Sequence, residues 1–249
     1  MKRAIMKAIV ASLAGMLVMA SSGGGGSSDP VDQTAMPPTS APPVATVGIL
    51  FEGDSTMYGS DVMSCANPNC QNVTGNEPVV VSALLNDKNG FGAGAVTGIN
   101  AGVPSSDLAE MLAGGNPQYP HSYPTLLERA QAKIVVSNHS MAGTTDQFKG
   151  YLNTFINETL SAGKIPVLEE PNPVCHNKRP NLDAYVVVMR RVAAERNVVL
   201  VPQYDTFKTN PYWETLLPDC VHPSANGYAI KARNTAQALV PLIQKIRSN

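Results

Sequence analysis

Short runs of apolar and β-branched residues recur along the chain, and each is about as long as one strand. Five such runs lie at Thr46–Phe51, Ala95–Asn100, Lys133–Ser137, Ile165–Glu169 and Val198–Pro202. A continuous apolar run of this length, bounded by polar or turn residues, is typical of a buried strand. The pattern therefore predicts five buried strands.

Segments with helical spacing of apolar residues lie between these runs. The clearest begins at Thr144, where Gln147 three residues later completes a capping box, and Gly163 is expected to end it. Its apolar face is expected to contain Phe148, Leu152, Phe155 and Leu160. This segment predicts an amphipathic helix that packs against the sheet.

Two further helices are expected at Leu182–Arg196 and Ser224–Arg247, the second with a kink near Pro241. The apolar face of the first is expected to contain Tyr185, Val186, Met189 and Val192. Alternating strands and helices predict an α/β fold, a three-layer α/β/α sandwich around a central, mostly parallel five-stranded sheet. Ligands bind such a sheet at the carboxyl ends of its strands.

The chain begins with a segment typical of protein export. Residues 1–20 combine a basic start, Met1-Lys2-Arg3 with Lys7, and an apolar run that ends in small residues. The run is short for a membrane span, so a cleaved bacterial-type signal is favoured over a retained anchor. Residues 21–46 are rich in Gly, Ser and Pro and predict a disordered tether. The folded domain is therefore expected at 47–249, in an exported protein that is periplasmic, associated with the cell envelope through its tether, or secreted.

Charge narrows the classes of partner. The formal net charge of the 249 residues is −1, and the sequence has no run of Lys or Arg. Nucleic-acid binding needs a basic surface, so we expect no nucleic acid as the main partner. The motifs call for no cofactor and no metal.

Four cysteines fit an oxidising compartment and allow three pairings. We expect Cys65 to pair with Cys70, and Cys175 with Cys220. An alternative is a zinc site made by Cys175, His176, Cys220 and His222. The ligand spacing of that set matches no common zinc site, so the disulfides are favoured.

Two short motifs far apart in the sequence supply the parts of a nucleophilic site. Ser55 lies in Gly53-Asp54-Ser55 after the first predicted strand, and Asp219 and His222 lie after the fifth. A serine hydroxyl needs an imidazole to accept its proton and a carboxylate to orient that imidazole. The order and placement of these residues predict a catalytic triad of Ser55, His222 and Asp219.

At these residues the sequence resembles the SGNH, or GDSL-type, hydrolase superfamily. The resemblance covers most of residues 47–249 and rests on Gly53-Asp54-Ser55, on Asp219-Cys220-Val221-His222-Pro223 and on Gly227-Tyr228. It implies a flavodoxin-like fold with Ser55 as nucleophile, His222 as base and Asp219 as acid.

The resemblance also implies an oxyanion hole that this sequence keeps only in part. Its donors would be the main-chain N–H groups of Ser55 and Ser105 and the side-chain amide of Asn138. The family usually has glycine where this chain has Ser105, for which Gly102 is the fallback. The residues around Asn138 also depart from the family block, at Ser137 and His139.

Other polar residues near these motifs are expected to be structural. Asp54 is interpreted as a turn-stabilising carboxylate, His139 as a structural or rim residue, and His121 and His176 as surface or loop residues. Five aromatic residues lie in predicted loops: Tyr58, Tyr119, Tyr123, Tyr212 and Trp213. Such side chains either stack on a sugar or an aryl group or contribute to packing, and we favour packing for most of them.

The function expected from this set is a serine esterase that acts on acyl esters through an acyl-enzyme. No long hydrophobic lid is evident, so short-chain or carbohydrate O-acetyl esters are favoured over long-chain lipids. Two alternatives stay open: an O-acetyltransferase acting on a glycan, and a non-catalytic envelope- or carbohydrate-binding module of the same fold.

Overall fold

The structure is a computed structural model that describes residues 45–60, 72–139 and 141–248. The predicted export signal, nearly all of the predicted tether and the expected Cys65–Cys70 bond lie outside the described residues. In the described part of the chain, no helix has the length and apolar character needed to cross a membrane.

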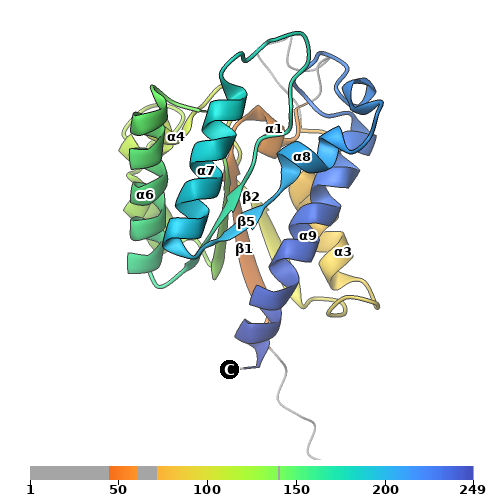
Figure 1. The fold of residues 1–249 in the computed structure, drawn as a ribbon. Coiled ribbons are helices and arrows are strands. Elements are labelled where there is room, and N and C mark those ends of the chain that lie inside the picture. Colours follow the sequence, from red (N-terminus) through yellow and green to blue (C-terminus); the bar gives the residue numbers. More distant parts are fainter. Residues whose placement is uncertain (1–44, 61–71, 140, 249) are drawn as a thin grey trace, which may run out of the picture. The chain divides into compact units, whose positions relative to one another are not determined.

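A five-stranded, all-parallel sheet forms the centre of the domain (Figure 1). Its strands are β1 (Val47–Gly53), β2 (Val96–Asn100), β3 (Ile134–Asn138), β4 (Ile165–Glu169) and β5 (Val199–Val201), in the order β2-β1-β3-β4-β5. The five predicted strands are confirmed to within one or two residues at each end. The chain crosses from β1 to β2 on one side of β1 and then returns to β3 on the other side. The crossover direction therefore reverses between β1 and β3. Sheets of this kind bind ligands at such a point, beyond the carboxyl ends of the strands.

Helices cover both faces of the sheet and complete the three predicted layers (Figure 1). One face packs against α3 (Glu77–Asn86) and α9 (Ala225–Arg247). The other face packs against α4 (Leu108–Ala113), α5 (Tyr123–Arg129), α6 (Thr145–Ser161) and α7 (Leu182–Arg196). Three short elements lie at the carboxyl ends of strands or follow them: α1 (Ser55–Tyr58), α8 (Gln203–Lys208) and the 3₁₀ helix η1 (Trp213–Leu216).

The two layers of core arise from the alternation of side chains along β1. Ile49 and Phe51 point into the core shared with α3 and α9, whereas Leu50 points into the core shared with α4 to α7. Successive residues of a strand face opposite sides, so a strand that is apolar at both sets of positions must be covered twice. This is why the apolar runs predicted strands buried on both faces.

Helix α6 begins with the predicted capping box and buries most of its predicted face. Thr144 Oγ1 accepts from the Gln147 N–H, and the Gln147 side chain accepts from the Thr144 N–H. The prediction for Leu160 is wrong, because its side chain is 51% exposed and Thr159 is buried instead. Thr159 lies eleven residues after Phe148, about three full turns, so it returns to the same face, while Leu160 is rotated by about 100°.

The other two predicted helices are also present. In α7, Val186, Met189 and Val192 are buried, and the Tyr185 ring packs edge-on against Phe148 with centroids 5.4 Å apart. Ser224 caps α9, and the helix continues past Pro241 to Arg247. The kink expected at Pro241 stays a prediction.

A buried ionic cluster joins the sheet to α3 and α9. Lys231 Nζ lies 2.5 Å from Glu169 Oε1 and 3.1 Å from Glu77 Oε2, and all three side chains are fully buried. Thr235 Oγ1 donates to Glu77 Oε1 at 2.6 Å. Burial and the neighbouring Glu77 raise the pKa of Glu169 to about 8, while the two carboxylates outweigh desolvation and raise the pKa of Lys231. Two carboxyl groups thus share one ammonium group.

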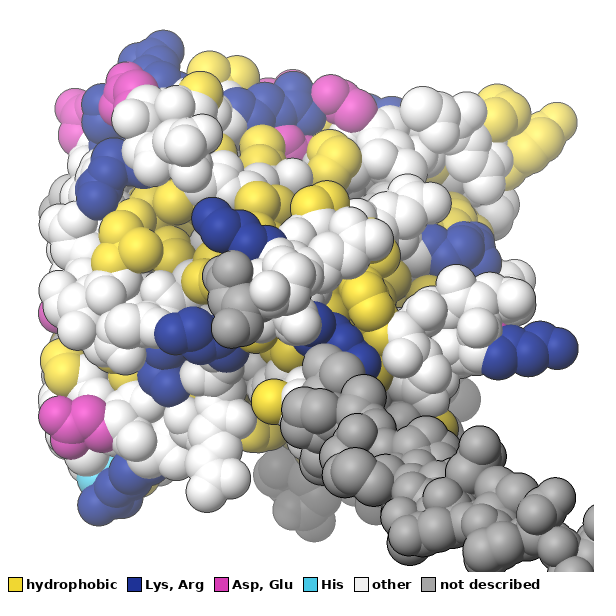
Figure 2. All heavy atoms as spheres, turned by 90° about the horizontal axis from the view of Figure 1, so that it is seen from below, with side chains coloured by type: hydrophobic (Ala, Val, Ile, Leu, Met, Phe, Trp, Pro, Cys, Tyr) yellow, Lys and Arg dark blue, Asp and Glu magenta, His cyan; other side chains and the backbone are white. Residues whose placement is uncertain are grey.

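The opposite edge of the sheet, at the amino ends of the strands, is closed by lysine side chains. Lys133 Nζ donates to Gly163 O at 2.7 Å, and Lys164 Nζ donates to Ala130 O and Ala132 O at 2.8 and 2.7 Å. Figure 2 shows this side of the molecule, where Lys and Arg side chains lie around a group of apolar side chains. The predicted triad residues and Asn138 lie at the other edge.

Candidate active site

The turn between β1 and α1 holds Ser55 at the carboxyl edge of the sheet. Asp54, which is buried, caps α1 and accepts hydrogen bonds from the Thr56 N–H at 2.8 Å and the Thr56 hydroxyl at 2.9 Å. A Cβ atom at Gly53 would lie 2.5 Å from Asn138 O, so only glycine fits before the turn. Asp54 therefore has the turn-stabilising position that was expected.

The segment from Asp219 to His222 is held by its own hydrogen bonds. Asp219 Oδ1 accepts from the main-chain N–H groups of Val221 at 2.9 Å and His222 at 2.7 Å. Cys220 between them has a left-handed φ of 69°, which turns the chain sharply enough for this. Partial burial would raise the pKa of Asp219, but the hydrogen bonds from the His222 ring and from these N–H groups lower it below its ordinary value.

The structure brings Ser55, His222 and Asp219 together, although 167 residues separate the serine from the histidine. Ser55 Oγ lies 2.9 Å from His222 Nε2, and His222 Nδ1 lies 2.7 Å from Asp219 Oδ2. All three residues are half-buried, so the serine is reachable from solvent. An imidazole that is oriented by a carboxylate and touches a hydroxyl can accept that hydroxyl's proton.

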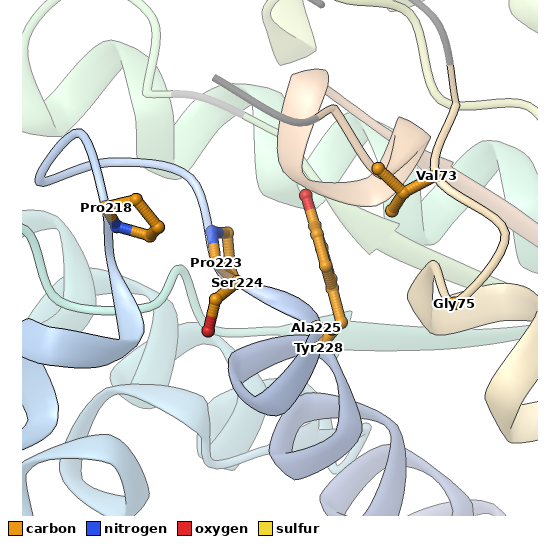
Figure 3. Close-up of a pocket in the computed structure, with 7 residues that line it drawn as sticks. All are labelled: Val73, Gly75, Pro218, Pro223, Ser224, Ala225 and Tyr228. Atoms are coloured by element: carbon orange, nitrogen blue, oxygen red, sulfur yellow. The ribbon is translucent and has the colours of Figure 1, made fainter. Parts of the chain in front are cut away.

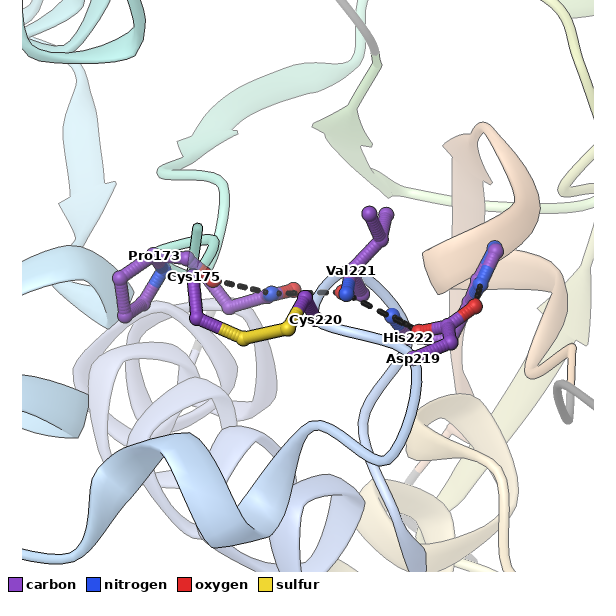
Figure 4. The surroundings of a disulfide bond; sticks show 7 residues. Pro173, Cys175, Asp219, Cys220, Val221 and His222 are labelled. Carbon is purple, nitrogen blue, oxygen red and sulfur yellow. Dashed lines mark hydrogen bonds and ion pairs between the residues drawn. A yellow bond between two sulfur atoms is a disulfide. The ribbon is translucent and has the colours of Figure 1, made fainter. Parts of the chain in front are cut away.

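A disulfide fastens the segment that contains Asp219 and His222 to the loop after β4 (Figure 4). The bond joins Cys175 to Cys220, as predicted, and the Cys175 N–H donates to Cys220 O at 3.0 Å. Asn172 Nδ2 adds a hydrogen bond to Val221 O at 3.0 Å. Cys175, His176 and Cys220 are close enough to hold a metal ion, but the two sulfur atoms are bonded to each other and so are not thiolate ligands.

The Cys175→Ala, Cys220→Ala double variant is expected to unfold with a free energy about 2–4 kcal/mol lower, because the bond closes a long loop. We also expect a lower kcat, because Asp219 and His222 lose a restraint on their loop. Thermal unfolding and ester hydrolysis measure the two effects. An unchanged midpoint and unchanged kcat would contradict this role of the disulfide.

Ser105, one of the predicted oxyanion donors, is exposed in the loop after β2. Its φ of 65° lies in the left-handed region that glycine adopts easily. The fallback donor, Gly102, already donates its N–H to Asn100 Oδ1 at 3.0 Å. Of these two N–H groups, that of Ser105 is therefore the better candidate.

The Ser105→Gly variant is expected to keep its activity and to gain about 1 kcal/mol of stability, because it relieves the left-handed strain and retains the N–H. Urea denaturation and kcat measure both. The matched variant Ser106→Gly is expected to lose stability, because the Ser106 hydroxyl bonds to Val103 O and Tyr119. A destabilised Ser105→Gly would show that the serine side chain is needed.

Asn138, the third predicted donor, ends β3 and is buried. Its Oδ1 accepts from the Thr56 hydroxyl at 2.8 Å, and its Nδ2 donates to Glu170 O at 2.9 Å and Glu169 O at 3.3 Å. These contacts join α1 and the end of β4 to the end of β3. In this arrangement the amide donates to the end of β4, so its role in an oxyanion hole stays a prediction.

Comparison with known proteins places this site in a family. A model of the GDSL-like lipase/acylhydrolase family matches residues 51–230, which is more than half of the chain. The chain belongs to the GDSL-like lipase/acylhydrolase family. The matched range includes Ser55, Asp219 and His222. A sequence comparison with curated proteins gave no match.

Solved structures share the fold of this GDSL-like chain. A GDSL-like lipase from Parabacteroides merdae is 18% identical with a TM-score of 0.59, covering 79% of this chain and 98% of its own. The acetylxylan esterase Axe2 from Geobacillus stearothermophilus is 19% identical with a TM-score of 0.57, covering 79% and 95%. LAE5, an α/β hydrolase from the metagenome of Lake Arreo, is 18% identical with a TM-score of 0.61, covering 78% and 95%.

His139, where this GDSL-like chain departs from the family block around Asn138, belongs to a buried hydrogen-bond network. His139 Nδ1 lies 3.0 Å from Ser137 Oγ, His139 Nε2 lies 3.4 Å from the Tyr119 hydroxyl, and that hydroxyl lies 2.8 Å from Ser106 Oγ. Burial lowers the pKa of His139 to about 4, although Asp54 acts in the other direction. His139 is therefore a neutral structural residue. Tyr119 and Ser106 were not predicted as its partners, because they come from a distant loop.

A small cavity lies beside the segment from Asp219 to His222 of this GDSL-like domain (Figure 3). It measures about 260 Å³ and is lined by Val73, Gly75, Pro218, Pro223, Ser224, Ala225 and Tyr228. Pro218 and Pro223 directly flank the segment from Asp219 to His222. In Figure 3 the Tyr228 ring stands between Pro223 and Val73.

The loop residues considered for ligand stacking are distributed between core and surface. Tyr119 and Tyr123 are buried and serve packing, whereas Tyr212 is 73% exposed. Tyr58 and Trp213 are partly buried. His121 and His176 are exposed, as expected for surface or loop residues.

Proposed function

We propose that this acylhydrolase is a serine esterase with Ser55 as nucleophile, His222 as general base and Asp219 as the orienting acid. The observation that carries the proposal is the continuous row of contacts from Ser55 Oγ to His222 Nε2 and from His222 Nδ1 to Asp219 Oδ2, at 2.9 and 2.7 Å. Membership of the GDSL-like lipase/acylhydrolase family supports the same reaction class.

The reaction proceeds in two steps through an acyl-enzyme. Ser55 Oγ attacks the carbonyl carbon while its proton passes to His222 Nε2, and the carbonyl electrons move to the oxygen. The carbonyl then re-forms, the ester C–O bond breaks, and the leaving alcohol takes the proton from His222. Water repeats the sequence on the acyl-Ser55 ester, releasing a carboxylic acid and the free serine. Asp219, ionised because its pKa is lowered, stabilises the imidazolium in both steps.

The Ser55 and Ser105 main-chain N–H groups are proposed to stabilise the oxyanion. Ser55 lies in the first turn of α1, where main-chain N–H groups have no partner within the helix. Ser105 is an exposed loop residue, and its backbone has the left-handed conformation that the family's glycine adopts easily. Asn138 is proposed as a third donor, which requires one amide hydrogen to leave the carbonyl groups at the end of β4.

Short-chain or carbohydrate O-acetyl esters are the proposed substrates, and an exported, envelope-associated location is the proposed setting. The sequence shows no long hydrophobic lid, which favours a small acyl group. The fold shared with an acetylxylan esterase agrees with an acetyl ester. The disulfide fits an oxidising compartment.

Hydrolysis of p-nitrophenyl esters from acetate to palmitate tests this function. Turnover is expected to be highest for acetate to butyrate and to fall steeply for longer chains. Acetate release from an acetylated oligosaccharide, measured with and without an added glycan acceptor, then separates a hydrolase from a transferase. A folded protein that cleaves no ester, or that transfers acetyl groups only to the acceptor, would contradict the esterase proposal.

A further inference from the structure

A buried carboxyl group without a partner lies three residues before the proposed nucleophile. Glu52 is on β1 and is fully buried, and neither of its carboxyl oxygens has a hydrogen-bond partner among the described residues. Buried polar groups are nearly always bonded to protein, water or a ligand. An orphaned carboxyl group near the carboxyl end of β1 therefore calls for a partner from outside the described residues, such as a ligand.

The chemistry of this group is that of a neutral acid. Burial raises the pKa of Glu52 to about 8, so at pH 7 it carries a proton. A protonated carboxyl offers one O–H donor together with acceptor oxygens. The titratable groups around it are the buried Tyr119 and Tyr123, and at the surface His121 and Arg129, whose Nη1 lies 2.5 Å from His121 Nε2.

Two adjoining cavities share this acid. One measures about 480 Å³ and the other about 210 Å³, and Glu52, Ala101, His121 and Leu126 line both. The other walls are mainly apolar, formed by Leu50, Ile99 and Ala130 in the first and by Val103 and Pro120 in the second. The larger volume falls within the ~300–1,000 Å³ typical of small-molecule sites, which are apolar with a few fixed polar groups.

The cavities lie on the far side of the loop that contains Ser105. Residues of β1, β2, the loop after β2, the loop between α4 and α5, and α5 line them, and Ser55, Ser105, Asp219 and His222 do not. Gly102 in this loop packs so closely on α1 that a Cβ atom would lie 2.4 Å from Tyr58 N. The Val103 N–H donates to Gly53 O at 2.8 Å. A ligand here would therefore be separate from the reacting ester.

We propose that these cavities bind a neutral, hydroxyl-bearing ligand, an alcohol or a sugar ring, through Glu52. A ligand hydroxyl both donates and accepts, which matches the protonated acid, and its carbon skeleton packs on Leu50, Ile99 and Leu126. Arg129 and His121 at the rim supply donors to further hydroxyl groups. A cationic ligand is disfavoured because it must pass Arg129, and an anionic ligand has no charged partner at the buried end.

The test uses the Ser55→Ala protein, so binding is measured without turnover and does not depend on the proposed triad. The probes are trans-1,2-cyclohexanediol and methyl β-D-glucopyranoside, with cyclohexanol methyl ether as the probe that lacks a donor. Amide chemical shifts should move with the diol at residues 99–103 and 119–129. Glu52→Leu should weaken diol binding by about tenfold or more, as expected for a lost buried hydrogen-bond partner. Glu128→Leu, an exposed control on α5, should leave binding unchanged.

Leu126→Trp provides a second, independent variant, because Leu126 lines both cavities from a partly exposed position and the larger ring takes up part of the space between them. This variant should weaken diol binding as well, and it keeps the test available if Glu52→Leu folds poorly. Diol binding that is equally tight in either folded variant, or shifts confined to other parts of the chain, would overturn the proposal. So would the absence of binding by both hydroxyl probes.

The pH dependence of the urea midpoint tests separately whether the Glu52 carboxyl lacks a partner. The unfolded Glu52 loses its proton near pH 4.5, whereas the folded one keeps it to about pH 8, so its contribution to stability is lost as the pH rises between these values. The urea midpoint of the parent should therefore fall relative to that of Glu52→Leu between pH 5 and pH 8. A constant difference across this range would show that the carboxyl already has a partner and would overturn the proposal.

Discussion

Replacing Ser55 by alanine is expected to lower kcat for p-nitrophenyl acetate by about 10⁴- to 10⁶-fold. The variant lacks the atom that forms the acyl-enzyme, so only the oxyanion donors and substrate binding still act. The Ser55 side chain is half-buried and its known contact is to His222, so the fold should be unaffected. Steady-state rates and circular dichroism of the two proteins measure both points.

The losses of activity caused by replacing single triad residues should not be additive. Ser55→Ala, His222→Ala combined should be about as slow as Ser55→Ala alone, because the serine and the histidine act as one unit. Asp219→Asn should lower kcat by about 10⁴-fold, since an amide at this position favours the wrong imidazole tautomer. Asp205→Asn changes an exposed carboxylate outside the site and serves as the control. Losses that multiply across Ser55 and His222 would contradict a shared proton transfer.

Replacing Lys231 by methionine is expected to lower the free energy of unfolding by about 3–5 kcal/mol at pH 8. The lysine is the partner of two buried carboxyl groups, Glu77 and Glu169. Without it, both carboxyls must stay protonated in the folded state and ionise on unfolding. The loss of stability is therefore small at pH 4.5 and grows as the pH rises towards 8. A carboxyl whose pKa is raised in the folded protein contributes fully to stability only below its unfolded-state pKa. Urea denaturation at several pH values measures it.

Two controls make the prediction for Lys231 specific. Lys245→Met, on the exposed side of the same helix, should change stability by less than about 1 kcal/mol. Adding Glu77→Gln and Glu169→Gln to Lys231→Met should remove most of the pH dependence, because neither amide ionises. A Lys231→Met protein as stable as the parent at pH 8 would mean that the cluster is not maintained by this charge.

Much of the fold was predictable because the local signals agree with it. Residues such as Ile49 and Leu50 are adjacent and both apolar, which only a strand covered on both faces requires. The capping box at Thr144 fixed the start of α6 because it depends on residues only three apart. Strand order was not predictable in the same way, because it depends on which distant strands pair.

The candidate site was predictable where it rests on short motifs. Ser55, Asp219 and His222 follow strands whose carboxyl ends meet at one edge, so their proximity follows from the topology. The direction of the Asn138 amide did not follow from its position, because it is set by carbonyl groups at the end of β4. Glu52 was not singled out either, since a strand residue gives no sign in the sequence that its side chain lacks a partner.

Labelling with a serine-directed fluorophosphonate, followed by mass spectrometry of the proteolysed protein, tests the central claim most directly. We predict one adduct per chain, located on Ser55, with loss of esterase activity in proportion to labelling. His222→Ala should slow the labelling strongly, because the hydroxyl then lacks its base. An active protein that is labelled on a residue other than Ser55, or that remains active with Ser55 fully modified, would contradict the triad.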